Sequence, residues 1–119
     1  MQQLAYQTKN VRYQKPYDSR EKHFPGMNYC GPGTDVWRRI KNGVEPVDAL
    51  DHAAYKHDLD TEPRGPYNSK GQRRKLRAAD RLLQRRAEKL IEEGYQPVWK
   101  AKAVAEGMKW MLITGARGR

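Results

Sequence analysis

Apolar residues recur at helical spacing in three stretches of the chain. The first stretch runs from about Val47 to Asp60, the second from about Arg73 to Glu93, and the third from Pro97 to about Thr114. In the first stretch, one helix face combines residues three, four and seven positions apart, namely Leu50, Ala53, Ala54 and His57. In the second, one stripe carries Leu76, Ala79, Asp80, Leu83, Ala87, Leu90 and Ile91. The patterns predict three helices, and Gly94 and Gly115 are stop signals for the last two.

The remaining segments carry loop signals. Residues 1–23 are polar and basic without a clear period, which predicts an N-terminal arm in front of one domain over residues 24–119. Residues 24–33 are dense in Pro and Gly, as expected of a loop with a fixed shape. Val36, Trp37 and Ile40 indicate a helical turn that ends near Asn42 and Gly43. The expected fold class is mainly α.

Composition narrows the class of protein. The 119 residues suffice for one domain with a modest core, and the net charge of +10 favours anionic partners such as nucleic acid or lipid headgroups. The single cysteine, Cys30, leaves no internal disulfide and argues against a disulfide-stapled secreted scaffold. We expect no signal peptide at the N-terminus and no transmembrane helix, because the apolar run Trp110–Ile113 is too short to span a bilayer.

Two polar side chains occupy core positions. His57 lies on the apolar face of the first helix, where the simplest interpretation is a hydrogen-bonded core histidine. Asp80 lies in the apolar stripe of the second helix, where a salt bridge to an Arg is the structural explanation. The functional alternative joins them, because two antiparallel helices would let Asp80 accept a hydrogen bond from His57. The other imidazole nitrogen would then be free to act as a general base.

The glycine-rich loop Tyr29–Thr34 is a second candidate for chemistry. A loop that bends this sharply is either a tight connection or a means of turning several backbone carbonyls inward. Carbonyl oxygens together with a carboxylate such as Asp58 suit Ca²⁺. No Gly-Lys-Ser/Thr follows, so the loop is not a Walker phosphate loop.

These motifs together carry a family resemblance. The loop Tyr29–Gly33, the helix with Asp51 followed by His57-Asp58, and the later pair Ala79-Asp80 resemble the phospholipase A2 superfamily. The likeness is greatest to the domain in the N-terminal unique region of parvovirus minor capsid proteins, which lacks the disulfides of secreted phospholipases. It covers roughly residues 24–111. It implies a small core of two long antiparallel helices, a Ca²⁺-binding loop and a C-terminal helix.

The resemblance also implies an activity and a set of site residues. The activity would be Ca²⁺-dependent hydrolysis of the sn-2 ester of glycerophospholipids, a carboxylic ester hydrolase reaction, in a virion protein that breaches a host endosomal or other intracellular membrane. His57 and Asp80 would be catalytic, and the Gly31 amide would contribute to the oxyanion site. The Ca²⁺ ligands would be the carbonyls of Tyr29, Gly31 and Gly33 and the carboxylate of Asp58.

Two positions depart from the family pattern. Thr61 stands where the family usually has a Tyr that supports the His/Asp network, and Thr34 stands where it usually has Asn. Both changes bear on the rate more than on the reaction. Candidate membrane contacts in the last helix are Trp99, Trp110 and Met111. The competing function is a basic capsid or nucleic-acid-binding module that keeps the scaffold without turnover, which the charge and the cluster at residues 73–77 favour.

Overall fold

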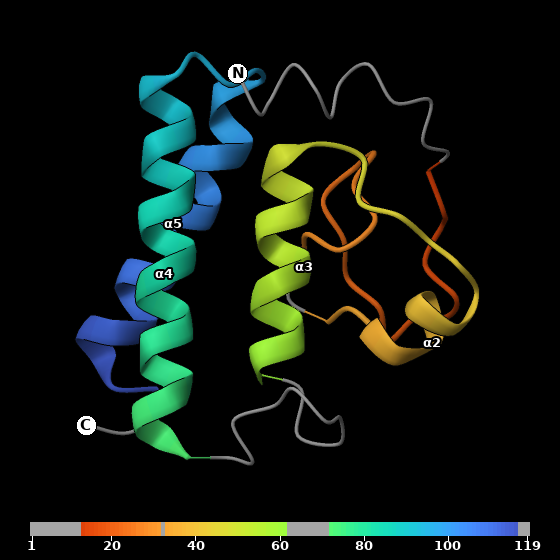
Figure 1. Cartoon of the computed structure of the whole chain (residues 1–119), viewed down its shortest axis with the longest axis horizontal. Coiled ribbons are helices and arrows are strands. Elements are labelled where there is room, and N and C mark those ends of the chain that lie inside the picture. The colour runs from red at the N-terminus through yellow and green to blue at the C-terminus, as the bar shows by residue number, and fades with distance from the viewer. Residues whose placement is uncertain (1–12, 32, 62–71, 117–119) are drawn as a thin grey trace. The chain divides into compact units, whose positions relative to one another are not determined.

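The computed structural model describes residues 13–31, 33–61 and 72–116 (Figure 1). Within these ranges the chain forms α-helices and no strand, and Cys30 is a free, buried thiol. The predicted fold class, mainly α without disulfides, is confirmed. The chain divides into two compact units, residues 1–58 and 59–119. Each unit is described by itself below.

The first unit contains a short helix and most of a longer one. Helix α2 spans Val36–Lys41, and helix α3 spans Ala49–Thr61, with its last residues in the second unit. Both lie where the sequence predicts helix. Asp48 caps the start of α3, because its carboxylate accepts a hydrogen bond from the Asp51 N–H at 2.9 Å. Gly43 follows α2 with φ of +71°, a conformation that favours glycine.

A buried ion pair holds residues 13–23 against α2. Arg39, on α2, is completely shielded from solvent and pairs with Glu21 at 3.0 Å. The same guanidinium donates hydrogen bonds to the carbonyls of Gln14 and Lys15 at 3.0 and 3.1 Å. The described part of the segment interpreted from sequence as an arm is therefore packed, because the charge of Arg39 is neutralised there. Residues 1–12 lie outside the described ranges.

The second unit is a helical hairpin. Helix α4 spans Arg73–Glu92 and helix α5 spans Val98–Thr114, and the two pack against each other in antiparallel orientation (Figure 1). Gly94 and Gly115 have φ of +88° and +69° and end the helices as predicted. Small and medium apolar side chains form the buried faces, namely Ala79, Leu83, Ala87 and Leu90 of α4 and Ala101, Val104 and Ala105 of α5.

Helix α5 exposes its tryptophans. The core uses the small residues of this helix, while Trp99 and Trp110 remain 52% and 61% exposed and Ile113 is 55% exposed. Met111, the third candidate membrane contact, is half-buried. Among the described residues, no helix has the length and apolar character needed to cross a bilayer.

Candidate active site

Helix α3 presents His57 and Asp58 side by side. The predicted face of this helix is buried, and His57 on it is only 8% exposed. The His57 Nδ1 lies 3.8 Å from the Asp58 Oδ1, which is an electrostatic contact and longer than a hydrogen bond. The imidazole and the carboxylate therefore lie next to each other, and they leave α3 about 100° apart around its axis.

Asp51 fastens the glycine-rich loop to α3. Its carboxylate accepts hydrogen bonds from three successive loop amides, those of Asn28, Tyr29 and Cys30, at 2.9, 2.7 and 2.9 Å. A fourth bond comes from the Val47 N–H at 2.9 Å. Asp51 is completely shielded from solvent. By its position three residues after Asp48, Asp51 resembles the acidic residue of a capping box, whereas its carboxylate mainly anchors the loop.

Burial and hydrogen bonding act in opposite directions on this carboxyl. Burial raises the pKa of Asp51, while the N–H groups of Val47, Tyr29 and Asn28 lower it by favouring the charged form. The net direction is a raised pKa. The four donors nevertheless occupy both carboxylate oxygens, so the ionised carboxylate is the form that satisfies all of them.

Gly31 and Gly33 allow the loop to pack closely on residues 20–23. A Cβ at Gly31 would overlap the Lys22 carbonyl oxygen, and one at Gly33 would lie 2.9 Å from the Arg20 carbonyl oxygen. The Gly33 N–H lies within 3.5 Å of the Lys22 carbonyl, and the Phe24 N–H donates to the Cys30 carbonyl at 2.9 Å. Because the Arg39–Glu21 pair holds this same segment, it also supports the loop indirectly.

Two of the predicted Ca²⁺-ligand carbonyls converge on one point. The Thr34 hydroxyl lies 3.0 Å from the Tyr29 carbonyl oxygen and 3.4 Å from the Gly31 carbonyl oxygen. It also lies 3.2 Å from the His23 Nε2. The two carbonyl oxygens therefore lie close to each other, and hard oxygen atoms of this kind are the ligands that Ca²⁺ prefers. Within the described ranges no group of three or more His, Cys, Asp or Glu side chains could hold a metal ion, so such a site would depend on backbone oxygens.

Comparison with known families decides which protein group this arrangement belongs to. A family model described as a phospholipase A2-like domain matches residues 20–98. The chain belongs to this family. No curated protein and no solved structure gives a significant match. The family prediction drawn from the loop and helix motifs is thus confirmed.

The phospholipase A2-like match includes the predicted catalytic and Ca²⁺-ligand residues but ends before the tryptophans at 99 and 110. Asp80 is only 1% exposed, so a carboxylate does occupy the core position expected from sequence. Asp80 and Thr61 belong to the second unit, however, and His57 to the first. The pairing of Asp80 with His57, the supporting role of Thr61 and the oxyanion role of Gly31 therefore stay predictions.

A pocket of about 410 Å³ in the first unit lies on the other side of α3. Its lining includes Tyr29, Val44, His52 and Tyr55. The Tyr29 hydroxyl donates to the Val44 carbonyl at 2.7 Å, and the rings of Tyr29 and Tyr55 meet edge to face at 4.8 Å. His52 precedes His57 by five residues, which places it about 140° around the helix. The pocket therefore lies beside a different face of α3 from the one that carries His57.

Proposed function

We propose that the chain is a Ca²⁺-dependent phospholipase A2 that hydrolyses the sn-2 ester of glycerophospholipids. His57 takes a proton from a water molecule as the water oxygen attacks the ester carbonyl. The tetrahedral intermediate then breaks its bond to the glycerol oxygen, which receives the proton from the imidazolium. The products are a fatty acid and a lysophospholipid. Asp80 orients the imidazole and stabilises its charged form, and the Gly31 amide donates to the oxyanion.

The Ca²⁺ would be held by the carbonyls of Tyr29, Gly31 and Gly33 and the carboxylate of Asp58. When bound, it would polarise the ester carbonyl and neutralise the substrate phosphate. The convergence of the Tyr29 and Gly31 carbonyls on the Thr34 hydroxyl supports this ligand set.

The clamp between Asp51 and the loop amides carries the proposal. It fixes the carbonyl-bearing loop to the helix that carries the general base and the carboxylate ligand. A tight connection without function has no need for a buried carboxylate with four N–H donors, because burying that charge is costly. Catalysis by positioned groups does need a rigid relation between the loop and the helix.

Hydrolysis of phospholipid vesicles tests the proposal. We expect fatty-acid release with Ca²⁺, none with a chelator, and a loss of at least about 100-fold in His57→Ala, since a general base contributes about that much or more. The matched control is His52→Ala, which removes an imidazole from the opposite side of the same helix and should retain activity. Absence of Ca²⁺-dependent release by the unmodified chain would show that the proposal is wrong.

Asp80→Asn tests the positioning role separately. The amide keeps the shape of the side chain but cannot stabilise an imidazolium as a carboxylate does, so we expect most of the activity to be lost and its pH profile to change. Unfolding stability, measured alongside, identifies a purely structural effect. Full activity with an unchanged pH profile would mean that Asp80 has another role.

We further propose that this activity serves a viral capsid protein during membrane breach in a host cell. The support is the likeness of the motifs to parvovirus capsid domains and the phospholipase A2-like family match. Detection of the chain in purified virus particles, and loss of infectivity in particles that carry His57→Ala, would support this setting. Particles that lack the chain, or that remain fully infectious with the substitution, would contradict it.

A further inference from the structure

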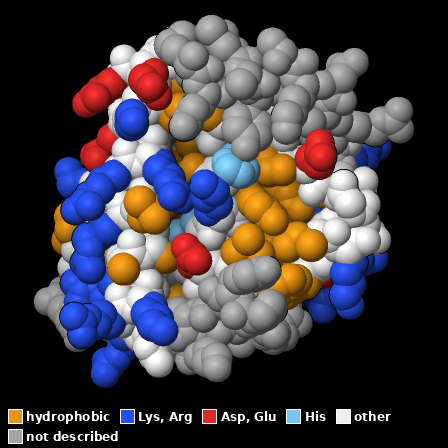
Figure 2. All heavy atoms as spheres, viewed as in Figure 1, with side chains coloured by type: hydrophobic (Ala, Val, Ile, Leu, Met, Phe, Trp, Pro, Cys, Tyr) orange, Lys and Arg blue, Asp and Glu red, His pale blue; other side chains and the backbone are white. Residues whose placement is uncertain are grey.

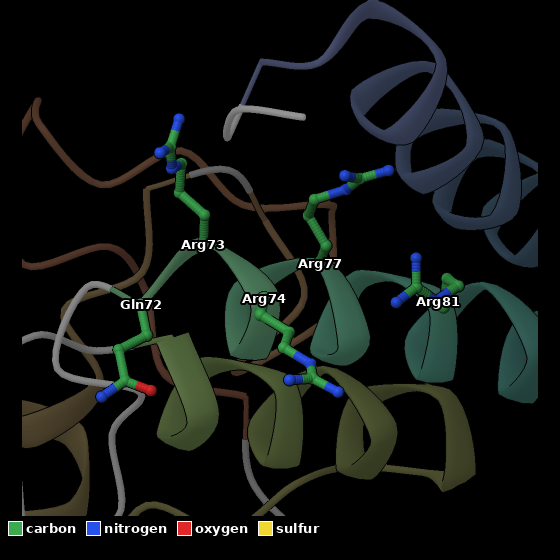
Figure 3. A pocket seen from close by; sticks show the side chains of 5 residues that line it. All are labelled: Gln72, Arg73, Arg74, Arg77 and Arg81. Carbon is green, nitrogen blue, oxygen red and sulfur yellow. The ribbon is translucent and has the colours of Figure 1, made fainter.

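Four arginines line a hollow on the first turns of α4. The hollow has a volume of about 450 Å³ and is formed by Gln72, Arg73, Arg74, Arg77 and Arg81 (Figure 3). In Figure 3 the arginine side chains extend from successive turns of one helix. All of these residues belong to the second unit and none is part of the catalytic or metal-binding set proposed above.

The cluster is unfavourable for the helix itself. Arg73, Arg77 and Arg81 are spaced four residues apart, where like charges repel, and cations at a helix N-terminus oppose the helix dipole. The first fourteen residues of α4 carry one acidic residue, Asp80, against seven basic residues, namely Arg73, Arg74, Lys75, Arg77, Arg81, Arg85 and Arg86. Figure 2 shows Lys and Arg side chains gathered over the region of α4.

The guanidinium groups are available to a ligand. Among the described residues none of the four arginines has an ion-pair partner. Arg73, Arg74 and Arg81 are exposed, and Arg77 is half-buried. The Nε of Arg77 has no hydrogen-bond partner in the described part of the chain. A planar guanidinium matches the geometry of a phosphate group, with which it forms paired hydrogen bonds. The chemistry of the hollow therefore fits an anion that carries phosphate.

The adjoining end of α5 indicates where such phosphates come from. Because α4 and α5 are antiparallel, the C-terminal turns of α5 lie at the same end of the hairpin as the N-terminal turns of α4 (Figure 1). Those turns expose Trp110 and Ile113, together with Lys109. Tryptophan and aliphatic side chains beside cations are typical of a bilayer interface. Binding to nucleic acid would instead favour aromatic residues among the arginines, and α4 has none.

We propose that the four-arginine hollow binds phosphate groups of anionic phospholipids and, with Trp110 and Ile113, docks the second unit on a membrane. This inference rests on the proposed phospholipase function, since docking brings the enzyme to its substrate. None of the hollow's four arginines belongs to the residues proposed for hydrolysis or for Ca²⁺ binding. The hollow makes membrane binding depend on the fraction of anionic lipid and independent of Ca²⁺.

Vesicle cosedimentation in the presence of a chelator tests the docking site. The probes are phosphatidylcholine vesicles with and without phosphatidylserine. Arg73→Gln/Arg77→Gln/Arg81→Gln should bind the phosphatidylserine vesicles about 100-fold more weakly than the unmodified chain, and Arg77→Gln alone about fivefold more weakly. The matched control, Arg85→Gln/Arg86→Gln/Lys89→Gln, removes the same charge from the same helix beyond the hollow and should lose less than about tenfold. Trp110→Ala should lose about tenfold.

The outcomes separate this inference from its alternatives. Equal losses in the two triple variants would overturn it, because general charge would then account for binding. Unchanged vesicle binding with a loss of duplex DNA binding at 150 mM salt would overturn it in favour of a nucleic-acid site. Since no hydrolysis occurs in chelator, vesicle binding by a chain that proves inactive with Ca²⁺ refutes the proposed function alone. Hydrolysis of dispersed short-chain phospholipid that survives the loss of vesicle binding supports both.

Discussion

Asp51→Asn should strongly destabilise the first unit, although the substitution exchanges only one side-chain oxygen for an amide nitrogen. The carboxylate accepts four buried N–H donors, whereas an asparagine amide offers one oxygen and presents its own N–H₂ to the remaining donors. Two backbone N–H groups therefore lose their acceptor. Hydrogen bonds to a charged group contribute about 1.5–3 kcal/mol each, so the expected loss for two bonds is about 3–6 kcal/mol of unfolding free energy. This is a large part of the stability of a small domain.

Urea unfolding followed by circular dichroism measures this loss, and calcium titration calorimetry measures its effect on the loop. We expect the urea midpoint to fall and the Ca²⁺ affinity to drop, although Asp51 is not a proposed ligand. The matched control is Asp48→Asn, three residues away, which removes the same charge. Because asparagine caps a helix as well as aspartate does, it should cost less than about 0.5 kcal/mol. Equal effects of the two substitutions would refute the argument that the loop amides determine the role of Asp51.

Substitutions at three positions, Glu21, Gly31 and Thr34, test the packing of the loop and its support. Burial alone would raise the pKa of Glu21, but hydrogen bonds from Arg39 and from the amides of Tyr17 and Asp35 lower it from 4.5 to about 2. The ionised Glu21 side chain therefore contributes its full stabilisation above pH 4.5 and loses it as the pH falls through 2. This predicts an unfolding free energy about 2 kcal/mol lower at pH 3 than at pH 7. In urea melts the difference should be smaller for Glu21→Gln. Gly31→Ala should lower the unfolding free energy by about 3 kcal/mol, because the new Cβ overlaps a backbone carbonyl. The control is Gly107→Ala, where a Cβ meets nothing within 4 Å. Thermal melts should show that this control raises stability by about 0.5–1 kcal/mol. Thr34→Val should lower the unfolding free energy by about 1 kcal/mol, because two carbonyls lose their contact with the hydroxyl. Thr34→Ser keeps a hydroxyl and should retain most of that stability. Equal melting behaviour of the two variants would contradict the role of the hydroxyl.

The sequence predicted the helices because their signals are local. Asp48 at the start of α3, Gly43 after α2 and Gly115 after α5 each fix a boundary through the conformation or hydrogen bonding of nearby residues. The spacing of apolar residues does not predict ion pairs between residues that are far apart in the sequence. Arg39 reads as one more basic residue on a short helix, although it is completely buried against Glu21, eighteen residues earlier. That pairing is what distinguishes the packed segment at residues 13–23 from the predicted arm.

For the candidate site, too, the sequence predicted the local motifs but not the contact between distant segments. His57, Asp58 and the glycine loop were predicted from residue type and spacing, and burial of His57 and Asp80 agrees with their predicted core positions. The role of Asp51 was missed, because helix caps and loop anchors use the same residue type. The one sequence signal was its spacing: Asp51 is seven residues before Asp58 and so lies on the same side of the helix. Thr34 was treated as a departure from the family, yet its hydroxyl bridges two of the carbonyls in question.

Peptide geometry joins the Asp51 clamp to the proposed Ca²⁺ site. In a trans peptide plane the N–H and the carbonyl point in opposite directions. The Cys30 N–H donates to Asp51 and shares its plane with the Tyr29 carbonyl, so that carbonyl must face away from the carboxylate. It does so, and accepts a hydrogen bond from the Thr34 hydroxyl instead. By gathering the amides on one side, Asp51 directs the first predicted ligand oxygen to the other. A carboxylate that never touches the cation would thereby set the arrangement of the oxygens that do.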